Sequence, residues 1–599
     1  MTTPSLPCAN SNLDGTDCQN LGTSSCKNCR LVVVISTSQY CGSNCQKAHW
    51  SVHKTDCKSA LNKAPWTPDW VLKNQTPAFV RGGIGVQFGG KKYLWGNVPA
   101  LDVLRLDSNE GEGYQGQLSL LFAASGDLRN VAKTMAQLPA SYDQPIKIIM
   151  NDLDLDIVAR NVIMLLVAFT ADSQDEAIDC MIHIWYSAFI RKYDLDILQQ
   201  RVRPLIQNVC DKIKEKPANS ALRKTWTFGQ RSLRLVLEKS TWDRLLSFME
   251  VPEGLTTEKG NEIRTAVTLA ESRVDYRDRQ FLFLSSSHRV ARHRYRQDGL
   301  LLPFGAPRSE FQQPNPTFFQ STDTWQMHDN ADPLNGWSAK DVETTPIGLA
   351  TSDIYGKLFH HVRFALKTFL ERISNLSITF QLFQLDAADL PAHLENESFD
   401  RIEVSNISDG GYLGIHRTVG LMSPLLKPPS THPHATLITL FMNVVDENMT
   451  DQDRMADATM QSPSTKRLLK FLPPNHPPTS RYDPDIIKFS YARDYVTTYD
   501  HILDRAANMF EFSRFPQFLG VTMKEKQTIV EKWPFRLKLK PEQKGAKEEF
   551  DLMMTGGHKS LESGKRHDHM KIKSNIKIVP SNGSPFQAVR PRREETRDL

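Results

Sequence analysis

The residues whose types and spacing could do chemistry are concentrated at the start of the chain. Seven of the nine cysteines fall within the first 57 residues, and only Cys180 and Cys210 lie beyond them. One histidine completes a set of eight zinc-type ligands: Cys8, Cys18, Cys26, Cys29, Cys41, Cys45, His53 and Cys57. Because structural zinc takes four thiolate or imidazole ligands, eight ligands suffice for two sites. We therefore expect a zinc module rather than a disulfide scaffold.

Three local elements would position these ligands. Two residues separate Cys26 from Cys29, which makes a tight knuckle that aims both sulfurs at one metal. Residues 31–36 are rich in β-branched side chains and predict a short hairpin. Residues 41–57 predict a helix, on which His53 and Cys57 share one face. A module this small buries too little apolar surface to fold alone, so metal binding would supply its folding free energy.

The whole pattern resembles the MYND-type zinc finger. The resemblance rests on three segments: Cys26-x2-Cys29, Tyr40-Cys41-Gly-Ser-Asn-Cys45-Gln46 and His49-Trp50-Ser-Val-His53-Lys54-Thr-Asp-Cys57. It implies two interleaved sites, the first held by Cys8, Cys18, Cys41 and Cys45, and the second by Cys26, Cys29, His53 and Cys57. Nine residues separate Cys8 from Cys18, whereas the family's first pair is usually close together. The alternative for Cys8 is a free thiol beside a degenerate first site, and His49 is expected to be a solvated or packing residue.

Fingers of this type generally bind proteins, often through short proline-containing peptides, so the resemblance implies a protein partner. It implies that Gln46 and Trp50 help to form the peptide surface, since an indole beside a side-chain amide suits an extended proline-rich ligand. Trp50 could instead cover the zinc core. The net charge of +5, from 73 basic and 68 acidic residues, is too small to indicate nucleic-acid binding. No apolar run approaches the ~20 residues that a membrane span requires.

A regular alternation of strands and helices follows the finger. Apolar runs over 118–124 and 146–150 predict buried parallel strands, and 130–138 and 157–169 predict the helices after them. This order predicts a right-handed parallel unit of Rossmann type. The alternation resumes later, with strands expected over 378–385, 399–405 and 434–443 and a helix over 412–426. The order of elements looks like a nucleoside-dependent methyltransferase sheet with a large insertion, expected to be mostly helical, for example over 179–190 and 225–248.

This second module also resembles a family. The resemblance is carried by LWGNVPALDVLRL, LSLLFAASGDLRNVAKTM and IIMNDLDLDIVARNVIMLL. They resemble the uncharacterised domain that follows MYND-type fingers in many fungal proteins, which is related to the N-terminal domain of the dynein axonemal assembly factor family. The resemblance implies a methyltransferase-like fold whose activity is open.

Three residues hold the places where a methyltransferase binds its cofactor. In such enzymes glycines after the first strand let the backbone approach the cofactor, and an acid ending the second strand receives the ribose hydroxyls. Here Gly126 and Asp127 follow the first strand and Asp152 ends the second. One interpretation is retained S-adenosylmethionine binding; the other is a scaffold that has lost its cofactor, with Asp152 as a helix N-cap. Asp409 is either close to a methyl acceptor or a turn residue, and no residue is assigned as catalytic.

The predicted protein is an α/β chain: a small two-zinc MYND-type finger, then a methyltransferase-like parallel sheet with a large helical insertion. The expected organisation is a finger over 8–57, a linker over 58–93, the two halves of the α/β domain over 94–171 and 351–450, the insertion over 172–350, loops and helices over 451–535, and a disordered basic tail over 536–599. The basic run 289–296 is expected to be a solvated helix face or a phosphate-binding patch, and 462–484 a loop.

The predicted function is that of an adaptor or scaffold, which binds two Zn²⁺ and recruits a proline-containing partner peptide. The alternative is an S-adenosylmethionine-dependent protein methyltransferase. Residues 1–10 have neither a basic start nor an apolar core of the kind that secretion signals carry, so an intracellular location, cytoplasmic or nuclear, is expected.

Overall fold

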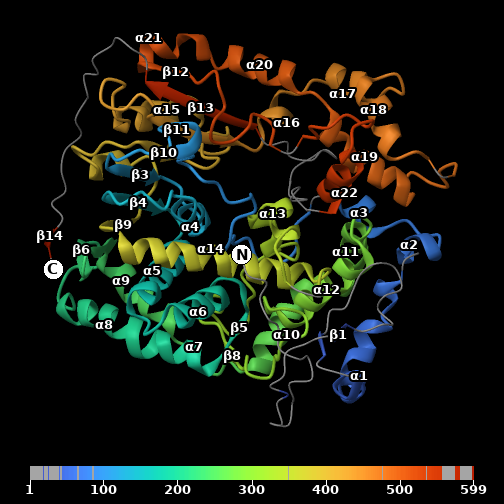
Figure 1. Ribbon diagram of the computed structural model, residues 1–599, viewed down its shortest axis with the longest axis horizontal. Helices are drawn as coiled ribbons and strands as arrows, with labels where there is room; N and C mark the ends of the chain where they lie inside the picture. The colour runs from blue at the N-terminus through green and yellow to red at the C-terminus, as the bar shows by residue number, and fades with distance from the viewer. Residues whose placement is uncertain are drawn as a thin grey trace.

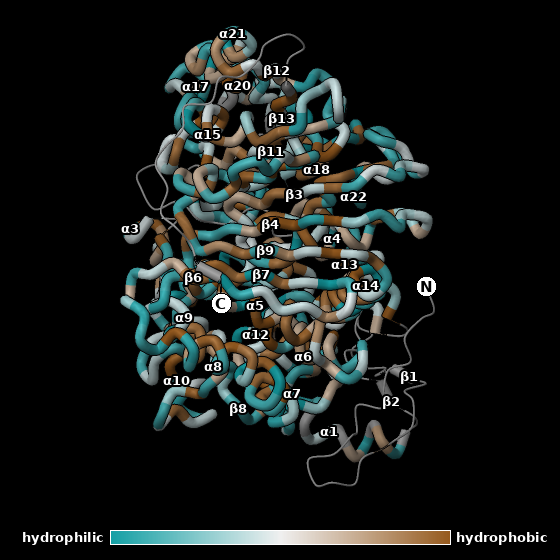
Figure 2. The backbone as a smooth tube through the Cα atoms, turned by 90° about the vertical axis from the view of Figure 1, so that its left-hand side faces the viewer, coloured by the Kyte–Doolittle hydropathy of each residue, from teal (hydrophilic) through white to brown (hydrophobic). Residues whose placement is uncertain are grey.

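The computed structural model describes residues 18, 24–25, 39–40, 43–63, 66–83, 86–347, 350–474, 476–534, 536–555, 574–580 and 597–598. Within these residues ten strands form one large sheet, in the order β12-β13-β11-β10-β3-β4-β9-β7-β6-β14. Figure 2 shows its strands lying one above another through the middle of the molecule. No helix in the described ranges is long and apolar enough to cross a bilayer.

The centre of the sheet is parallel. Its strands are β3 (Leu118–Phe122), β4 (Ile146–Asp152), β7 (Arg231–Glu238), β9 (Ile378–Gln384), β10 (Arg401–Glu403) and β11 (Thr436–Phe441). Every neighbouring pair from β11 to β7 is parallel. The strands predicted over 118–124, 146–150, 378–385, 399–405 and 434–443 are thus confirmed. Their apolar runs reflect burial on both faces of the sheet, because helices cover each side.

The first strand of the sheet, β3, lies in its middle, and later strands are added on both sides of it. From β3 it moves to β4, and β9 later pairs with the far side of β4. The next strand, β10, returns to the opposite side of β3, and β11 pairs with β10. Ser119 beside this junction donates its backbone N–H to the Asp400 carboxylate, a contact between residues 281 positions apart. The direction of building therefore reverses between β3 and β10.

Alternate residues of the strands face two separate cores. Leu120, Phe122 and Ile148 belong to one hydrophobic cluster, whereas Leu121 and Ile149 belong to the other. The first cluster includes side chains of α4 (Arg129–Ala136), α5 (Leu155–Thr170), α6 (Gln174–Tyr186) and α14 (Ile354–Asn375). The second includes α15 (Ile415–Met422), α16 (Val444–Asn448), α20 (Asp500–Met509) and α21 (Phe515–Leu519). The result is three layers, with helices on both faces of the sheet.

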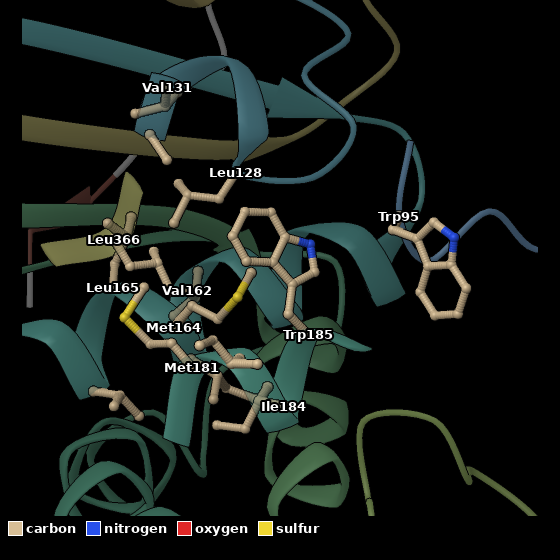
Figure 3. Packing of buried hydrophobic residues seen from close by; sticks show 14 of the residues in the cluster. Trp95, Leu128, Val131, Val162, Met164, Leu165, Met181, Ile184, Trp185 and Leu366 are labelled. Atoms are coloured by element: carbon tan, nitrogen blue, oxygen red, sulfur yellow. The ribbon is translucent and has the colours of Figure 1, made fainter. Parts of the chain in front are cut away.

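Figure 3 shows how the first cluster is packed. Leu128 precedes α4 and Val131 lies on it, Val162 comes from α5, and Trp185 from α6, and their side chains meet over the sheet. Leu366 of α14 closes the group from another side. This packing fixes the helices that follow β3 and β4, and so the two loops that lead into them.

The insertion adds strands to the sheet, contrary to prediction. The helix expected over 225–248 is wrong: these residues continue β6 (Ala221–Phe228), turn at Gly229 and form β7 before the short helix α9 (Lys239–Leu245). Leu233, Leu235 and Leu237 are buried at a spacing of two, the period of a strand. The other helices of the insertion are α7 (Lys192–Ile197), α8 (Arg203–Lys212), α10 (Thr257–Thr268), α11 (Val274–Phe281), α12 (Ser286–Asp298) and α13 (Ala339–Glu343).

The segment expected to be a disordered tail contains ordered elements. Helix α22 (Ala546–Thr555) buries Phe550, which stacks on Phe471. Strand β13 (Ser574–Pro580) lies antiparallel to β11, and β12 (Val521–Met523) pairs with β13. The loop expected over 462–484 also begins as a helix. That helix is α18 (Pro463–Phe471); α17 (Asp451–Ala458) precedes the region, and α19 (Pro484–Val496) begins at its end.

The expected linker over 58–93 is likewise folded onto the body. It contains the short helices α2 (Asp69–Leu72) and α3 (Ala78–Gly82), whose Trp70 and Phe79 are buried. Their rings form an edge-on contact, and Phe79 also packs on Tyr276 of α11. The buried rings of Trp70 and Phe79 thus attach this segment to the body, although its prolines and glycines predicted an extended linker.

The finger consists of β1 (Ser24–Ser25), β2 (Gln39–Tyr40) and α1 (Ser43–Cys57), with β1 and β2 antiparallel. The helix predicted over 41–57 is confirmed, whereas the hairpin expected over 31–36 lies outside the described residues. In Figure 1 α1 lies at the lower right, beside the α10–α12 part of the insertion.

Helix α12 carries the basic run, and its arginines attach the finger to the body. Arg294 pairs with Asp56 of α1 at 3.1 Å, and Arg289 donates to the backbone oxygens of Leu61 and Lys63 at 3.0 and 2.8 Å. Arg296 is buried and donates to the Asp329 carbonyl. Residues 289–296 therefore form neither a solvated helix face nor a phosphate-binding patch. Their guanidiniums donate to acceptors within the protein.

Candidate functional site

Four of the eight predicted zinc ligands lie in the described part of the finger: Cys18, Cys45, His53 and Cys57. The sulfurs of Cys18 and Cys45 are 3.7 Å apart. Two thiolates on one tetrahedral zinc, each about 2.3 Å from the metal, would be separated by about 3.8 Å. The pair therefore has the spacing that a shared zinc requires, and it is a pair that the resemblance assigns to the first site. The other four, Cys8, Cys26, Cys29 and Cys41, lie outside the described residues.

The second pair comes from the last turns of α1. His53 and Cys57 are four residues apart on this helix, which places them on one face. His53 is only 1% exposed, and the Trp50 ring meets its imidazole edge-on at 5.9 Å between centroids. Trp50 itself is half-buried. The indole thus shields a predicted zinc ligand and keeps part of its surface in solvent, so its geometry is compatible with either of the two roles considered for it. The Gln46 side chain lies outside the described set.

A second candidate site is a cleft at the carboxyl edge of the sheet. Its volume is about 1330 Å³, and it is lined by the residues that follow β3, β4, β10 and β11. Gly126, Asp127 and Asp152, the three predicted cofactor residues, all line it. Residues of α22 and of the segment 530–539 line it as well. In open α/β sheets a ligand binds outside the carboxyl ends of the strands where the direction of building reverses, which is the place of this cleft.

The loop after β3 is built around Gly126. Its φ of +55° is a left-handed conformation, and a Cβ placed there would meet no atom within 4 Å. Asp152 accepts the Gly126 N–H at 2.9 Å and the Asp154 N–H at 3.0 Å, and burial raises the pKa of this carboxyl. The N-cap of α5 is Asp154 instead, which accepts from Asp156. Because a carboxylate offers about four acceptor positions, Asp152 keeps capacity for a ligand hydroxyl.

Asp127 has a different use. Its buried carboxylate accepts from the Gly96 N–H at 3.0 Å, from the Trp185 indole at 3.1 Å and from Arg129. These three donors tie the loop after β3 to residue 96 and to α6. Asp127 therefore shapes the wall of the cleft, with its acceptor positions largely taken by the protein.

Asp409 does not line the cleft. It accepts from the backbone N–H groups of Met442 and Asn443, which fixes the residues after β11, and burial raises its pKa to about 6. The geometry fits the turn role that was one of its two alternatives.

One residue of the cleft was missed by the sequence reasoning. Glu403 is the last residue of β10 and is 5% exposed, and it lines the cleft. One of its oxygens accepts the Ser405 N–H at 2.8 Å, while Oε2 has no hydrogen-bond partner in the part of the chain that the structure describes. Burial raises the pKa of this carboxyl to about 7. The available signal was an acid inside a strand whose neighbours are apolar, at the same edge as Gly126 and Asp152.

Comparison with known families matches two segments of the chain. Residues 15–57 match the MYND finger, and residues 94–190 match a domain of unknown function, DUF4470. A MYND finger and a DUF4470 domain are thus present, and the finger implies zinc binding and suggests a role in protein–protein interaction. The comparisons with curated proteins and with solved structures found no match.

Proposed function

We propose that this chain is a zinc-dependent adaptor whose MYND finger holds two Zn²⁺ and binds a proline-containing segment of a partner protein. The observation that carries the proposal is the place of Trp50, half-exposed on α1 above the buried His53. The ion pair between Asp56 and Arg294 anchors the helix to the body, so the peptide surface is presented in a fixed orientation. Kinship with the fungal proteins and with the dynein axonemal assembly factor family stays a prediction.

The charges around Trp50 indicate the chemistry of the partner. Lys47 and Lys54 are exposed and lie three residues before and four residues after the indole, which places all three on one stripe of α1. Neither lysine forms an ion pair with a described residue. We therefore propose that the segment carries acidic residues beside its proline, because an apolar ring flanked by ammonium groups complements that pattern.

Substitution of Trp50 by alanine should weaken binding of such peptides by about tenfold or more, since a partly desolvated aromatic anchor is the kind of residue that dominates small interfaces. An array of proline-containing peptides, with and without flanking aspartates, finds the ligand, and fluorescence anisotropy measures its affinity. Zinc content must stay at the wild-type value, because Trp50 donates no ligand atom. Lys54→Glu should also weaken the aspartate-containing peptides, whereas Lys212→Glu on the distant α8 should not. Unchanged affinity in Trp50→Ala would refute the proposed surface.

A second function is favoured by the cleft: binding of S-adenosylmethionine, with a methyl group passed to a protein partner. The spatial order β9-β4-β3-β10-β11 supports it, because it is the order of a nucleotide-binding sheet with its reversal between β3 and β10. Gly126 would let the cofactor approach the backbone, and Asp152 would accept from the ribose hydroxyls. S-adenosylmethionine would bring an activated methyl group; this chain's residues would bind and orient it.

Asp152→Asn should weaken binding of S-adenosylhomocysteine to the full-length chain by about tenfold, because an amide loses the charge-assisted hydrogen bonds of a carboxylate. Isothermal titration calorimetry measures this affinity directly. The matched control is Asp143→Asn, an exposed aspartate that precedes β4 at the opposite edge of the sheet and should leave the affinity unchanged. The absence of binding to the wild-type chain at millimolar ligand would end this second proposal.

A further inference from the structure

The cleft has two halves with different chemistry. Gly126 and Asp152 lie on the β3–β4 side, where backbone groups and carboxylates dominate. Glu403 lies on the other side of β3, at the end of β10, where several large apolar side chains line the cleft. The apolar residues of this half are Ile407, Leu413, Ile438, Leu440 and Met442. Ser405 and Asn406 are the polar neighbours of Glu403 in this half, and the Glu403 carboxyl is the group there that lacks a full set of hydrogen-bond partners.

Glu403 is buried with one of its two carboxylate oxygens unpartnered. Its Oε1 accepts the Ser405 N–H and the Asn130 side chain also donates to the carboxyl, whereas Oε2 has no hydrogen-bond partner among the described residues. The positive charge of Arg129 acts on Glu403 only through space, because its guanidinium donates to Asp127 and to the carbonyls of Val98 and Gly336. An unpartnered buried acceptor costs free energy, and proteins retain such groups mainly where a ligand or ion satisfies them.

The backbone beside Glu403 is strained in a way that holds the carboxyl in place. Ser405 has a φ of +50°, a left-handed conformation that a residue with a side chain adopts at a cost. This conformation brings its N–H to Glu403, while its carbonyl accepts from Leu440 of β11 at 2.8 Å. Both Ser405 and Leu440 line the cleft. The turn therefore fixes one oxygen of Glu403 and leaves the other available.

We propose that Glu403 Oε2 accepts a hydrogen bond from an amino group that the ligand carries where its aliphatic body joins the nucleoside, so that the β10–β11 half of the cleft takes an amine at this junction. This assignment rests on the proposed nucleoside-binding function of the cleft. An ammonium group is the best complement to the site, because it supplies both the missing donor and a positive charge, and the aliphatic part can pack on Ile407, Leu440 and Met442.

Two nucleoside probes that differ at one position test the assignment on the full-length chain. Both probes end in the same α-amino acid, and they differ only where the aliphatic body joins the nucleoside: S-adenosylhomocysteine has a thioether sulfur there, and sinefungin has a carbon that bears a primary amine. We expect calorimetry to show sinefungin binding about tenfold more tightly than S-adenosylhomocysteine. In Glu403→Gln and Glu403→Met that preference should fall below about twofold, with the affinity for S-adenosylhomocysteine within about threefold of wild type. Asp152→Asn should weaken both probes and keep the preference.

The outcomes separate the two proposals. Failure of both probes to bind the wild-type chain overturns the nucleoside-binding function and the amine assignment with it. Binding of both with equal affinity, or a preference that survives in Glu403→Gln and Glu403→Met, overturns the amine assignment alone. Thermal melting without ligand gives an independent readout: Glu403→Met should raise the Tm, because it removes an unpartnered buried carboxyl, and a marked fall would show that the carboxyl serves the fold instead.

Discussion

Replacement of Cys45 by serine should lower the zinc content of the chain from the two ions proposed to one and destabilise the finger. Structural zinc contributes about 10–16 kcal/mol to the folding of small zinc modules, and a module this size has little apolar core to compensate for its loss. The Cys45 sulfur lies 3.7 Å from the Cys18 sulfur, and both would bind the zinc of the first site, so removal of the Cys45 thiol leaves that site without one ligand. Inductively coupled plasma mass spectrometry measures the zinc, and limited proteolysis of residues before Leu61 reports the unfolding.

The body of the protein should survive this change. Its two large cores draw no side chain from the described residues before Leu61, so loss of the finger leaves them packed. Cys210→Ser is the matched control: this buried cysteine lies in α8, burial raises the pKa of its thiol to about 11, and it should leave two zinc ions bound. A Cys45→Ser chain that still holds two zinc ions would show that the ligand set is misassigned.

Replacement of Arg401 by methionine should destabilise the α/β domain by about 3–5 kcal/mol, the usual result of leaving a buried charge without its partner. Arg401 opens β10 and is fully buried. Its guanidinium pairs with Glu110 at 2.6 Å and donates to the carbonyls of Val103, Leu104 and His434. Methionine is long enough to fill the space but leaves the Glu110 carboxylate and four carbonyls, including that of Asp400, with fewer donors.

Urea denaturation followed by tryptophan fluorescence measures this loss, and Arg417→Met provides the control. Arg417 is exposed on α15 and makes no ion pair with a described residue, so its replacement should change the free energy of unfolding by less than about 0.5 kcal/mol. A loss below about 1 kcal/mol in Arg401→Met would mean that the Arg401–Glu110 pair barely exceeds its desolvation cost.

The central strands and the ligand spacing were predictable because the signals are local. The runs that became β3, β4 and β11 are apolar on both faces and are bounded by turn residues, and the cysteine spacings need no tertiary information. The β6–β7 hairpin was missed because Arg231 and Arg234 interrupt its apolar residues, and the remainder fits either a helix or a strand. Strand β13 was missed because its partner, β11, lies far away in the sequence.

In the candidate site too, the residues with a local sequence signal were predictable and those that depend on tertiary contacts were not. Gly126 and Asp152 were predictable from their places at the ends of two recognisable strands, and both line the cleft. The arginines of α12 were misread because burial of a guanidinium depends on acceptors such as the Leu61 and Asp329 carbonyls, which no local pattern reveals. Glu403 was missed because an unsatisfied oxygen becomes visible only when all its neighbours are in place.

The pairing of β3 with β10 has a consequence for how the protein is made. Contacts across this junction join residues 281 positions apart, and a ribosome that adds roughly 5–20 residues per second needs roughly 15–55 s to supply the second strand after the first. During that interval the nascent chain presents β3 with one edge open, and the strand is almost wholly apolar. Such an edge is a template for wrong pairing, so the emerging α/β domain is a natural client for a chaperone until β10 arrives to close it.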